Sequence, residues 1–308
     1  MTRLRATQGT HGLKMEAFYK MAQITRQGYF QALERQNQED QLMSKIKPLV
    51  ERFRKEKDSR AGSRTLYYWL KIKDRYGIGV TKFENLMSDY GLSLKPLRVR
   101  VVTTQSTKQS WNYLDLSKGR LVNGINQLVV GDLTYINYGK DRYFLFCLTD
   151  IYSARIVGHA WSERMRAQDA KEAFDRWIRS RGRRCVKGCI HHTDGGSQYF
   201  SELYLSAMQK AELQVSVAKS CLDNGFAEQR NAVVKHHLLP VMRPGLKGDA
   251  LRKEFKRILQ IYNQERTQQN LGWKSPADFE KYWSDKDNRP ILRVYDRDQK
   301  MHTVRYGF

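Results

Sequence analysis

The spacing of hydrophobic positions divides the chain near residue 120 into two parts. Before that point, apolar residues recur every three or four positions, which is the period of a helix that buries one face. After about residue 125, runs of β-branched and aromatic residues typical of strands are separated by helical stretches. The pattern therefore predicts an all-α region followed by an α/β domain.

Two stretches of the helical part have the outline of a helix-turn-helix, a DNA-binding motif. Residues 14–35 predict two short helices, and Thr25 is placed to cap the second. Residues 60–92 predict the same arrangement, with Ser63 and Thr81 as candidate caps. An ordinary helical hairpin is the alternative for the first unit. Two such units in tandem favour DNA binding more than either alone.

A charged helix and a linker are predicted around the second unit. Residues 40–58 read as one helix with an apolar inner face, made of Leu42, Ile46, Leu49, Val50 and Phe53. Residues 95–120 lose periodicity and collect basic side chains among many Ser, Thr and Gln, which predicts a linker.

The second part of the chain predicts three consecutive strands and then an alternation of helix and strand. The expected strands are 126–137, 142–152, 155–162, 188–194 and 213–218, and the expected helices are 167–181, 201–211, 225–238 and 249–266. This order describes an RNase H-like α/β fold with a mixed sheet. The last residues, 291–308, read as a β-hairpin.

The net charge narrows the choice of partner. The chain has 55 Lys and Arg against 32 Asp and Glu, a formal net charge of +23, and both parts contribute to the excess. Such a charge predicts a polyanion, with DNA or RNA first and an anionic membrane surface second. No segment approaches the ~18–20 apolar residues of a membrane span, and the first residues lack the apolar core of a signal peptide.

Three acidic residues stand in three different local settings. Asp132 follows a β-branched run, Asp194 lies where a strand ends in glycines, and Glu228 lies in a helical stretch. On the predicted topology the three acids meet. Asp132 lies on the first strand, Asp194 at the end of the fourth, and Glu228 on the helix after the fifth. A buried carboxylate is costly unless something positive meets it, and several together indicate a divalent metal site. Oxygen ligands favour Mg²⁺ or Mn²⁺.

Other residues that bear chemistry have competing interpretations. Cys185, Cys189, His191 and His192 could suggest zinc, but a strand would aim alternate side chains at opposite faces, so we interpret the cysteines as small buried hydrophobes. Four cysteines suit a reducing cytosol. A buried, hydrogen-bonded histidine is favoured at both His positions over one lining a site.

Three further charged residues lie near the candidate site in sequence. Asp150 is interpreted as a loop or capping residue, and Asp223 as a turn former before the helix of Glu228. Lys235 could contact a DNA phosphate, with a solvated helix face as the alternative.

Three segments of the chain resemble a known family. HHTDGGSQY, DNGFAEQRNAVVK and YNQERTQQNLGWKSPADF are similar to motifs of the DDE transposases of bacterial insertion sequences, of the OrfB type with a retroviral-integrase-like core. The resemblance implies that Asp194 and Glu228 are metal ligands and that Lys235 is the family's basic residue. It identifies residues 262–279 as the C-terminal signature YNxxRxHxxLGxxTPxxF.

The sequence departs from the family pattern in two places. Between Asp194 and Glu228 lie 33 residues where the family usually has 35, and the shortfall falls in the loop between Val217 and Asp223. In the C-terminal signature, Gln268 or Gln269 stands where the family usually has His. Neither departure touches a proposed metal ligand.

Together these observations predict a transposase that binds terminal inverted repeats and target DNA, and that cuts and joins DNA through Asp132, Asp194 and Glu228, with Mg²⁺ or Mn²⁺. A homo-oligomer on DNA is expected, a partner protein from an upstream reading frame is allowed, and no membrane is involved. The expected location is the bacterial cytoplasm, in association with the nucleoid. The alternatives are a non-catalytic sequence-specific DNA-binding protein and an RNase H-like nuclease that does not join strands.

The expected domain boundaries and DNA contacts follow from the same patterns. The N-terminal part comprises a helix-turn-helix and charged helix at 1–60, a second helix-turn-helix-like unit at 61–105 and a basic linker at 106–120. The RNase H-like integrase core follows at 121–285, and a β-hairpin tail at 286–308. The basic residues expected to contact DNA are Arg26, Arg64, Lys82, Arg98, Arg100 and Lys235.

Overall fold

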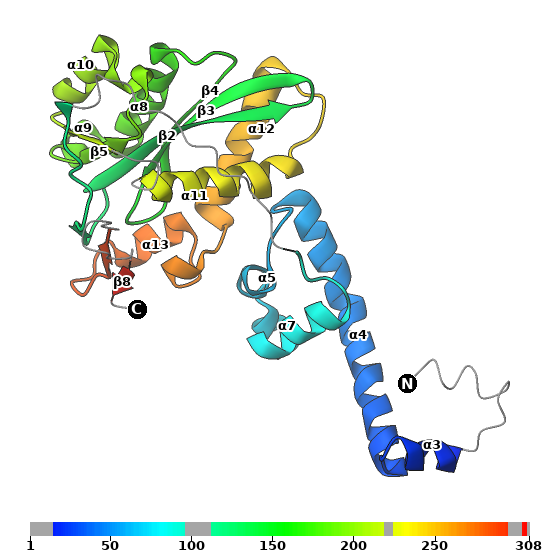
Figure 1. Cartoon of the computed structure of the whole chain (residues 1–308). Coiled ribbons are helices and arrows are strands. Elements are labelled where there is room, and N and C mark those ends of the chain that lie inside the picture. Colours follow the sequence, from blue (N-terminus) through cyan, green and yellow to red (C-terminus); the bar gives the residue numbers. More distant parts are fainter. Residues whose placement is uncertain (1–14, 96–111, 219–223, 295–303, 307–308) are drawn as a thin grey trace.

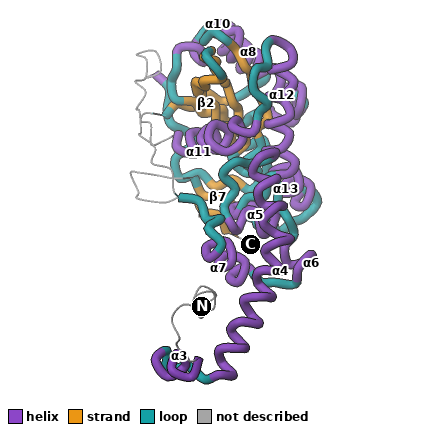
Figure 2. The backbone as a smooth tube through the Cα atoms, turned by 90° about the vertical axis from the view of Figure 1, so that its right-hand side faces the viewer, coloured by secondary structure: helices purple, strands orange, loops and turns teal. Residues whose placement is uncertain are grey.

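A long helix connects the two ends of the molecule. The computed structural model describes residues 15–95, 112–218, 224–294 and 304–306. The α/β core lies at one end, and the helix α4 (Arg26–Glu56) leads away from it to α3 (Met15–Met21) at the other (Figures 1 and 2). No helix in the described ranges has the length and apolar character needed to cross a membrane.

The core is built on one five-stranded mixed sheet of order β4-β3-β2-β5-β6. The antiparallel strands β2 (Leu128–Tyr138), β3 (Asp141–Asp150) and β4 (Ile156–Ser162) follow each other along the chain. β5 (Ile190–Thr193) and β6 (Gln214–Val217) then extend the sheet in parallel with β2. The predicted order of strands along the chain and the RNase H-like α/β class are confirmed.

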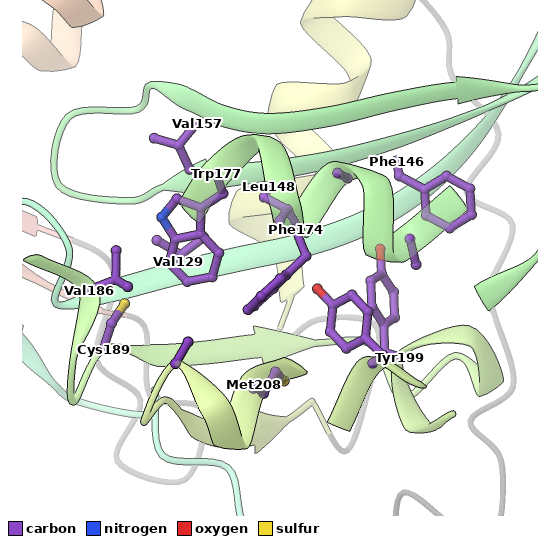
Figure 3. Close-up of a cluster of buried hydrophobic side chains, with 14 of the residues drawn as sticks. Val129, Phe146, Leu148, Val157, Phe174, Trp177, Val186, Cys189, Tyr199 and Met208 are labelled. Carbon is purple, nitrogen blue, oxygen red and sulfur yellow. The ribbon is translucent and has the colours of Figure 1, made fainter. Parts of the chain in front are cut away.

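Helices cover both faces of this sheet (Figure 1). On β3, alternate side chains enter two different hydrophobic clusters, because successive side chains of a strand point to opposite faces. One face packs against α8 (Ala167–Arg181) and α10 (Glu202–Lys210), and Figure 3 shows Phe174 and Trp177 of α8 among the side chains of the strands. The other face packs against α12 (Gly248–Gln260) and the helix that follows β6.

Short helices complete the core. The helix after β6 begins as α11 (Gly225–Val233) and continues as the π-helical segment η4 (Val234–Leu238), and α12 continues in the same way as η6 (Ile261–Glu265). The remaining short helices are α9 (Arg183–Val186), η2 (Ser197–Phe200), η5 (Leu239–Val241), η7 (Gln269–Leu271) and α13 (Pro276–Trp283).

The N-terminal helices differ from the prediction in length. Thr25 caps α4 as expected, because its side chain accepts a hydrogen bond from Gly28 N, but α4 does not end near residue 35. It runs for 31 residues, so the second short helix and the charged helix 40–58 are one element. The stretch between them contains no Gly or Pro that would interrupt a helix.

The second helical unit consists of α5 (Ser63–Trp69), α6 (Ile72–Tyr76) and α7 (Val80–Asp89). Lys71, with a φ of 52°, interrupts the single helix predicted from Ser63 to Tyr76. The residues at the N-cap positions of α5 and α7 are Gly62 and Gly79, so the predicted caps at Ser63 and Thr81 are wrong.

One hydrophobic cluster unites α4 with α5, α6 and α7. Its buried members include Ile46, Val50, Leu66, Phe83 and Met87. The predicted boundary at residue 60 therefore falls inside a single core. The C-terminal half of α4 supplies one wall of that core, while the N-terminal half extends beyond it (Figure 1).

The C-terminal tail forms the expected antiparallel pair of strands. β7 (Ile291–Arg293) pairs with β8 (Val304–Tyr306) and also with β1 (Leu121–Val122), so the tail belongs to a three-stranded sheet within its own chain. The end of the predicted linker also contacts the core, since Leu114 O accepts a hydrogen bond from Val217 N of β6.

Candidate active site

The sheet and one helix bring the three predicted acids to the same region. Gly131 on β2 pairs in parallel with Thr193 on β5, so the next residues, Asp132 and Asp194, lie at corresponding positions on neighbouring strands. Glu228 lies on α11, which packs across β2. Residues 62 and 34 positions apart in sequence are thereby placed within electrostatic reach of one another.

Two hydrogen bonds hold the carboxylate of Asp132. Leu133 N donates to its Oδ1 at 2.9 Å, and Asn231 Nδ2 donates to its Oδ2 at 2.8 Å. Asn231 follows Glu228 by three residues and therefore shares its side of the helix. Sequence reasoning missed Asn231, although this spacing was a signal that could have indicated it.

A second asparagine also ties α11 to β2. The side chain of Asn224, at the N-cap position of α11, donates from Nδ2 to Gly131 O at 3.3 Å. Gly131 itself leaves no room for a side chain, because an added Cβ would lie 2.9 Å from His191 Cε1. Two hydrogen bonds thus attach α11 to β2, one at Gly131 and one at Asp132 itself.

The charge of Asp194 raises the pKa of the other two carboxyl groups. The pKa of Asp132 is raised to about 7, mainly because the group is buried and then because of the negative charge of Asp194, with Glu228 adding to it. Burial raises the pKa of Asp194 as well. The pKa of Glu228 is raised by desolvation and by the charge of Asp194. A bound cation would relieve this repulsion.

The donor set fits a hard divalent cation. Three carboxylates supply only oxygen ligands, which Mg²⁺ and Mn²⁺ prefer. Among the described residues, no group of three or more His, Cys, Asp and Glu side chains is already gathered closely enough to hold a metal ion. Asp132 and Asp194 come from adjoining strands, and Glu228 is exposed on α11.

The two histidines before Asp194 belong to the supporting structure. His191 is buried, with Nδ1 3.1 Å from Val129 O and Nε2 2.7 Å from the hydroxyl of Tyr204. Burial lowers its pKa to about 4, so the ring is neutral at physiological pH. His192 is buried too, with Nδ1 2.9 Å from Ser216 Oγ. The interpretation as buried, hydrogen-bonded histidines is confirmed.

Asp150 has the turn role that the sequence indicated. It is fully buried, its Oδ2 accepts from Asn126 N at 2.7 Å, and its Oδ1 accepts from the backbone of Tyr152 and Ser153. These bonds close the turn after β3, and none of them involves Asp132, Asp194 or Glu228. Asp223 lies outside the described residues, as does most of the shortened loop before Glu228.

Lys235 lies on an aromatic ring. Its Nζ is 4.4 Å from the centre of the Tyr135 ring, and the guanidinium carbon of Arg142 is 5.5 Å from the same ring. The Tyr135 side chain is 48% exposed, so the three residues form a basic, partly aromatic surface. Lys235 follows Glu228 by seven residues, which places it two helical turns further along the same side.

The other predicted DNA contacts are only partly described. Arg64 pairs with Glu84 at 2.8 Å, and Lys82 pairs with Glu39 at 3.1 Å. Arg26 lies over the ring of Phe30 on α4. Arg98 and Arg100 lie outside the described residues. Because exposed ion pairs contribute little, Arg64 and Lys82 could exchange their carboxylates for phosphates.

The C-terminal signature supports the core through polar contacts. The side chain of Asn263 makes two hydrogen bonds to the backbone of Ile156 at the start of β4. Gln268, one of the two positions where the family usually has His, is buried and accepts a hydrogen bond from Arg230 of α11 at 2.6 Å. This part of the signature therefore contacts the helix that carries Glu228.

The same signature reaches the N-terminal region. Arg266 Nε donates to the buried carboxylate of Asp58 at 3.0 Å, and Nδ1 of His237 lies 2.9 Å from the other oxygen of Asp58. Trp273 stacks on Tyr68 of α5 with ring centres 4.2 Å apart. These contacts join the helical region to the ends of η4 and η6. Nothing in the sequence pattern indicated them.

Comparison with known proteins agrees with this arrangement. Residues 123–221 match the integrase core domain family. The chain is 30% identical over 230 residues to a putative transposase for insertion sequence element IS986/IS6110 of Mycobacterium tuberculosis, which covers 72% of this chain and 82% of that relative. It is 32% identical over 176 residues to the transposase for insertion sequence element IS904 of Lactococcus lactis, which covers 54% of this chain and 68% of that relative.

A solved structure of similar architecture is the catalytic core domain of HTLV-2 integrase in complex with magnesium. It is 20% identical in sequence with a TM-score of 0.41, over 51% of this chain and 97% of the other.

The sheet, the helix that crosses it and the integrase core match define an enzyme of the DDE polynucleotidyl transferase class. Within that class, the chain belongs to the insertion-sequence transposases. Enzymes of this family act on DNA with divalent metal ions and form oligomers on it.

Proposed function

We propose that this chain binds the terminal inverted repeats of an insertion sequence and cleaves and joins DNA strands through Asp132, Asp194 and Glu228. The observation that supports this most directly is that three acids from β2, the end of β5 and α11 come together, so that the charge of Asp194 raises the pKa of both Asp132 and Glu228. A bound cation would explain why the protein gathers acids whose charges repel. A polyanionic substrate would explain its net charge of +23.

Each acid has a distinct part in the proposed site. Asp132 and Asp194 would hold metal ions from adjoining strands, and Glu228 would complete the site from α11. When bound, two divalent ions activate a water or a 3′-hydroxyl and stabilise the leaving oxygen of an in-line phosphoryl transfer. Asn231 keeps the Asp132 carboxylate in one orientation through its hydrogen bond to Oδ2.

The DNA would be positioned by groups beside the acids and by the helical region. Lys235 and Arg142 would contact phosphates next to the exposed ring of Tyr135. The N-terminal helices would recognise the terminal repeats, with Arg26, Arg64 and Lys82 among the contacts. A homo-oligomer would bring the two ends together, and a protein from an upstream reading frame could contribute to recognition.

A strand-transfer assay with labelled terminal DNA tests the proposal. Asp132→Asn, Asp194→Asn and Glu228→Gln should each abolish cleavage and joining in Mg²⁺ or Mn²⁺ while DNA binding stays within about twofold, because each removes a ligand and leaves the basic surface. Asp141→Asn is the matched control, since Asp141 is exposed at the turn between β2 and β3.

The outcomes of this assay separate the alternatives. Strand transfer at a normal rate by any of the three variants would remove that residue from the site. Hydrolysis without joining by the wild-type protein would indicate a nuclease. Binding without any metal-dependent cleavage would indicate a DNA-binding protein that only retains the fold.

A further inference from the structure

An open cleft runs along the edge strand β4, between α8 and α12. Its volume is about 700 Å³. Six of its lining side chains are cations and two are carboxylates: Arg155, Arg176, Arg179, Arg252, Lys253 and Lys256, with Glu172 and Asp249. We call this feature the β4 cleft. None of the three proposed catalytic acids lines it, and β4 is separated from β2 by β3.

Half of the cations in the β4 cleft have no carboxylate partner. Arg155 pairs with Glu280, Arg176 with Glu172 and Arg252 with Asp249, at 2.6, 2.5 and 3.9 Å. In contrast, Arg179, Lys253 and Lys256 make no ion pair with any residue that the structure describes, and all three are exposed. The cleft therefore carries a net positive charge that the residues described by the structure do not neutralise.

The floor of the cleft adds no opposing charge. His159 lies there on β4, and its pKa is lowered to about 3 by burial and then by the charges of Arg176 and Lys256. The ring is therefore neutral at physiological pH. Burial is the main cause of this lowered pKa, and the charges of Arg176 and Lys256 add to it.

The free edge of β4 is closed to strand addition. Arg176 Nη1 donates to His159 O at 2.8 Å, and Ser180 Oγ donates to Val157 O at 3.2 Å. Asn263 bonds to both backbone groups of Ile156. Because these side chains already occupy the outward backbone groups, an added β-strand from a partner would find few groups left to pair with.

The arrangement of the cations on α8 and α12 fits a polyanion. Arg176 and Arg179 lie one turn apart on α8, and Lys253 and Lys256 lie one turn apart on α12. The two rows face the same cleft from opposite sides of β4. A second copy of this chain presenting the same face would bring like charges together, which opposes association without a bridging anion.

We propose that the β4 cleft binds the sugar-phosphate backbone of a DNA segment other than the one held at the catalytic acids. The proposal rests on the proposed function, because it assigns a second DNA site to the same enzyme. Backbone contacts of this kind position DNA without reading its sequence. The second segment would therefore be bound with little sequence preference.

The test measures the affinity of the full chain for a random-sequence duplex as a function of salt. It uses the Asp132→Asn background in a chelator, so that binding is observed without chemistry. The cleft variant is Lys253→Glu with Lys256→Glu. The matched control is Arg184→Glu with Lys210→Glu, which changes the charge equally at exposed positions on α9 and α10 outside the cleft.

The cleft variant should bind at least about tenfold more weakly than the control near 0.1 M salt, and the slope of log K against log salt should fall by about 2. The neutral pair Arg179→Gln with Lys253→Gln should change both quantities in the same direction by less. Far-ultraviolet circular dichroism of each variant establishes that it is folded.

Two results would overturn the proposal. Equal weakening by the cleft variant and the control would mean that overall charge, not the cleft, governs binding. A change in oligomer mass by light scattering, with the salt slope unchanged, would make this face a contact between copies of the chain. If the wild-type chain binds DNA through the cleft but shows no metal-dependent joining of DNA strands, that result would count against the proposed function alone.

Discussion

Replacing Asp132 with Asn should stabilise the protein when no metal is bound. Asp132 is a half-buried acid beside two others, and its pKa of about 7 means that the folded protein holds the charged form poorly. Asn is nearly the same size and carries no charge. Its Oδ1 can still accept from Leu133 N. Asn231 Oδ1 has no hydrogen-bond partner among the described residues, so a turned Asn231 amide could accept from the new Nδ2.

The size of the effect follows from the pKa. The folded-state pKa of about 7 lies roughly three pH units above 3.8, the usual pKa of an Asp side chain, and each pH unit corresponds to about 1.4 kcal/mol. Because the pKa is raised on folding, the wild type is relatively most stable below pH ~4 and loses stability as the pH rises towards 7. Allowing for partial solvent exposure, the variant should gain about 2 to 4 kcal/mol at pH 8, or roughly 5 °C in Tm.

Asp150→Asn provides a matched comparison. The pKa of Asp150 is also raised by burial, to about 6. This carboxylate, however, accepts from three backbone N–H groups, and an amide cannot accept on both of its sides. Its replacement should therefore destabilise the protein at every pH, by about 1 to 3 kcal/mol.

Thermal melts of the full chain in a chelator, at pH 4.5 and pH 8, measure both variants. Asp132→Asn should melt higher than the wild type at pH 8, with a much smaller difference at pH 4.5. Mn²⁺ should then raise the Tm of the wild type more than that of the variant. A lower Tm for Asp132→Asn at pH 8, or a difference that does not change with pH, would refute the idea that the acids repel one another.

Three further predictions concern the same contacts. Asn231→Ala should raise the pKa of Asp132 further, because the lost hydrogen bond favours the charged form, and should move the acid limb of the pH–rate profile upward; an unchanged profile would contradict this. A fragment of residues 1–105 should bind terminal DNA more tightly than random DNA in a filter-binding assay, and equal affinities would defeat the idea. Asp58→Ala should cost about 3 kcal/mol in urea unfolding because it leaves the buried Arg266 unpaired, whereas an effect below ~1 kcal/mol would show that the contact is dispensable.

The order of elements in the core could be predicted from the sequence because local patterns encode it. Apolar spacing gave the bounds of α8 at 167–181, as the structure has them. The β-branched runs gave β2 to β4 to within a few residues, since both faces of the sheet are buried. The positions of Asp132 on the first of these strands and of Asp194 just after the fourth, β5, then followed from the order of the elements.

Local sequence patterns were less informative about where a helix ends. No breaker separates residues 35 and 40, so α4 continues, and packing of its second half against α5 and α7 decides its length. Propensity alone is too weak to place such an end, because tertiary packing supplies most of the stability of a helix.

Only the tertiary structure decided which polar side chains meet. Asn231 bonds to Asp132 across 99 residues, and Arg266 bonds to Asp58 across 208. The sequence did not show that either pair meets, because a hydrogen bond between distant segments depends on where folding places them. The sequence determined the elements and the candidate acids, whereas the contacts that orient Asp132 and attach the helical region to the core arise only in the folded chain.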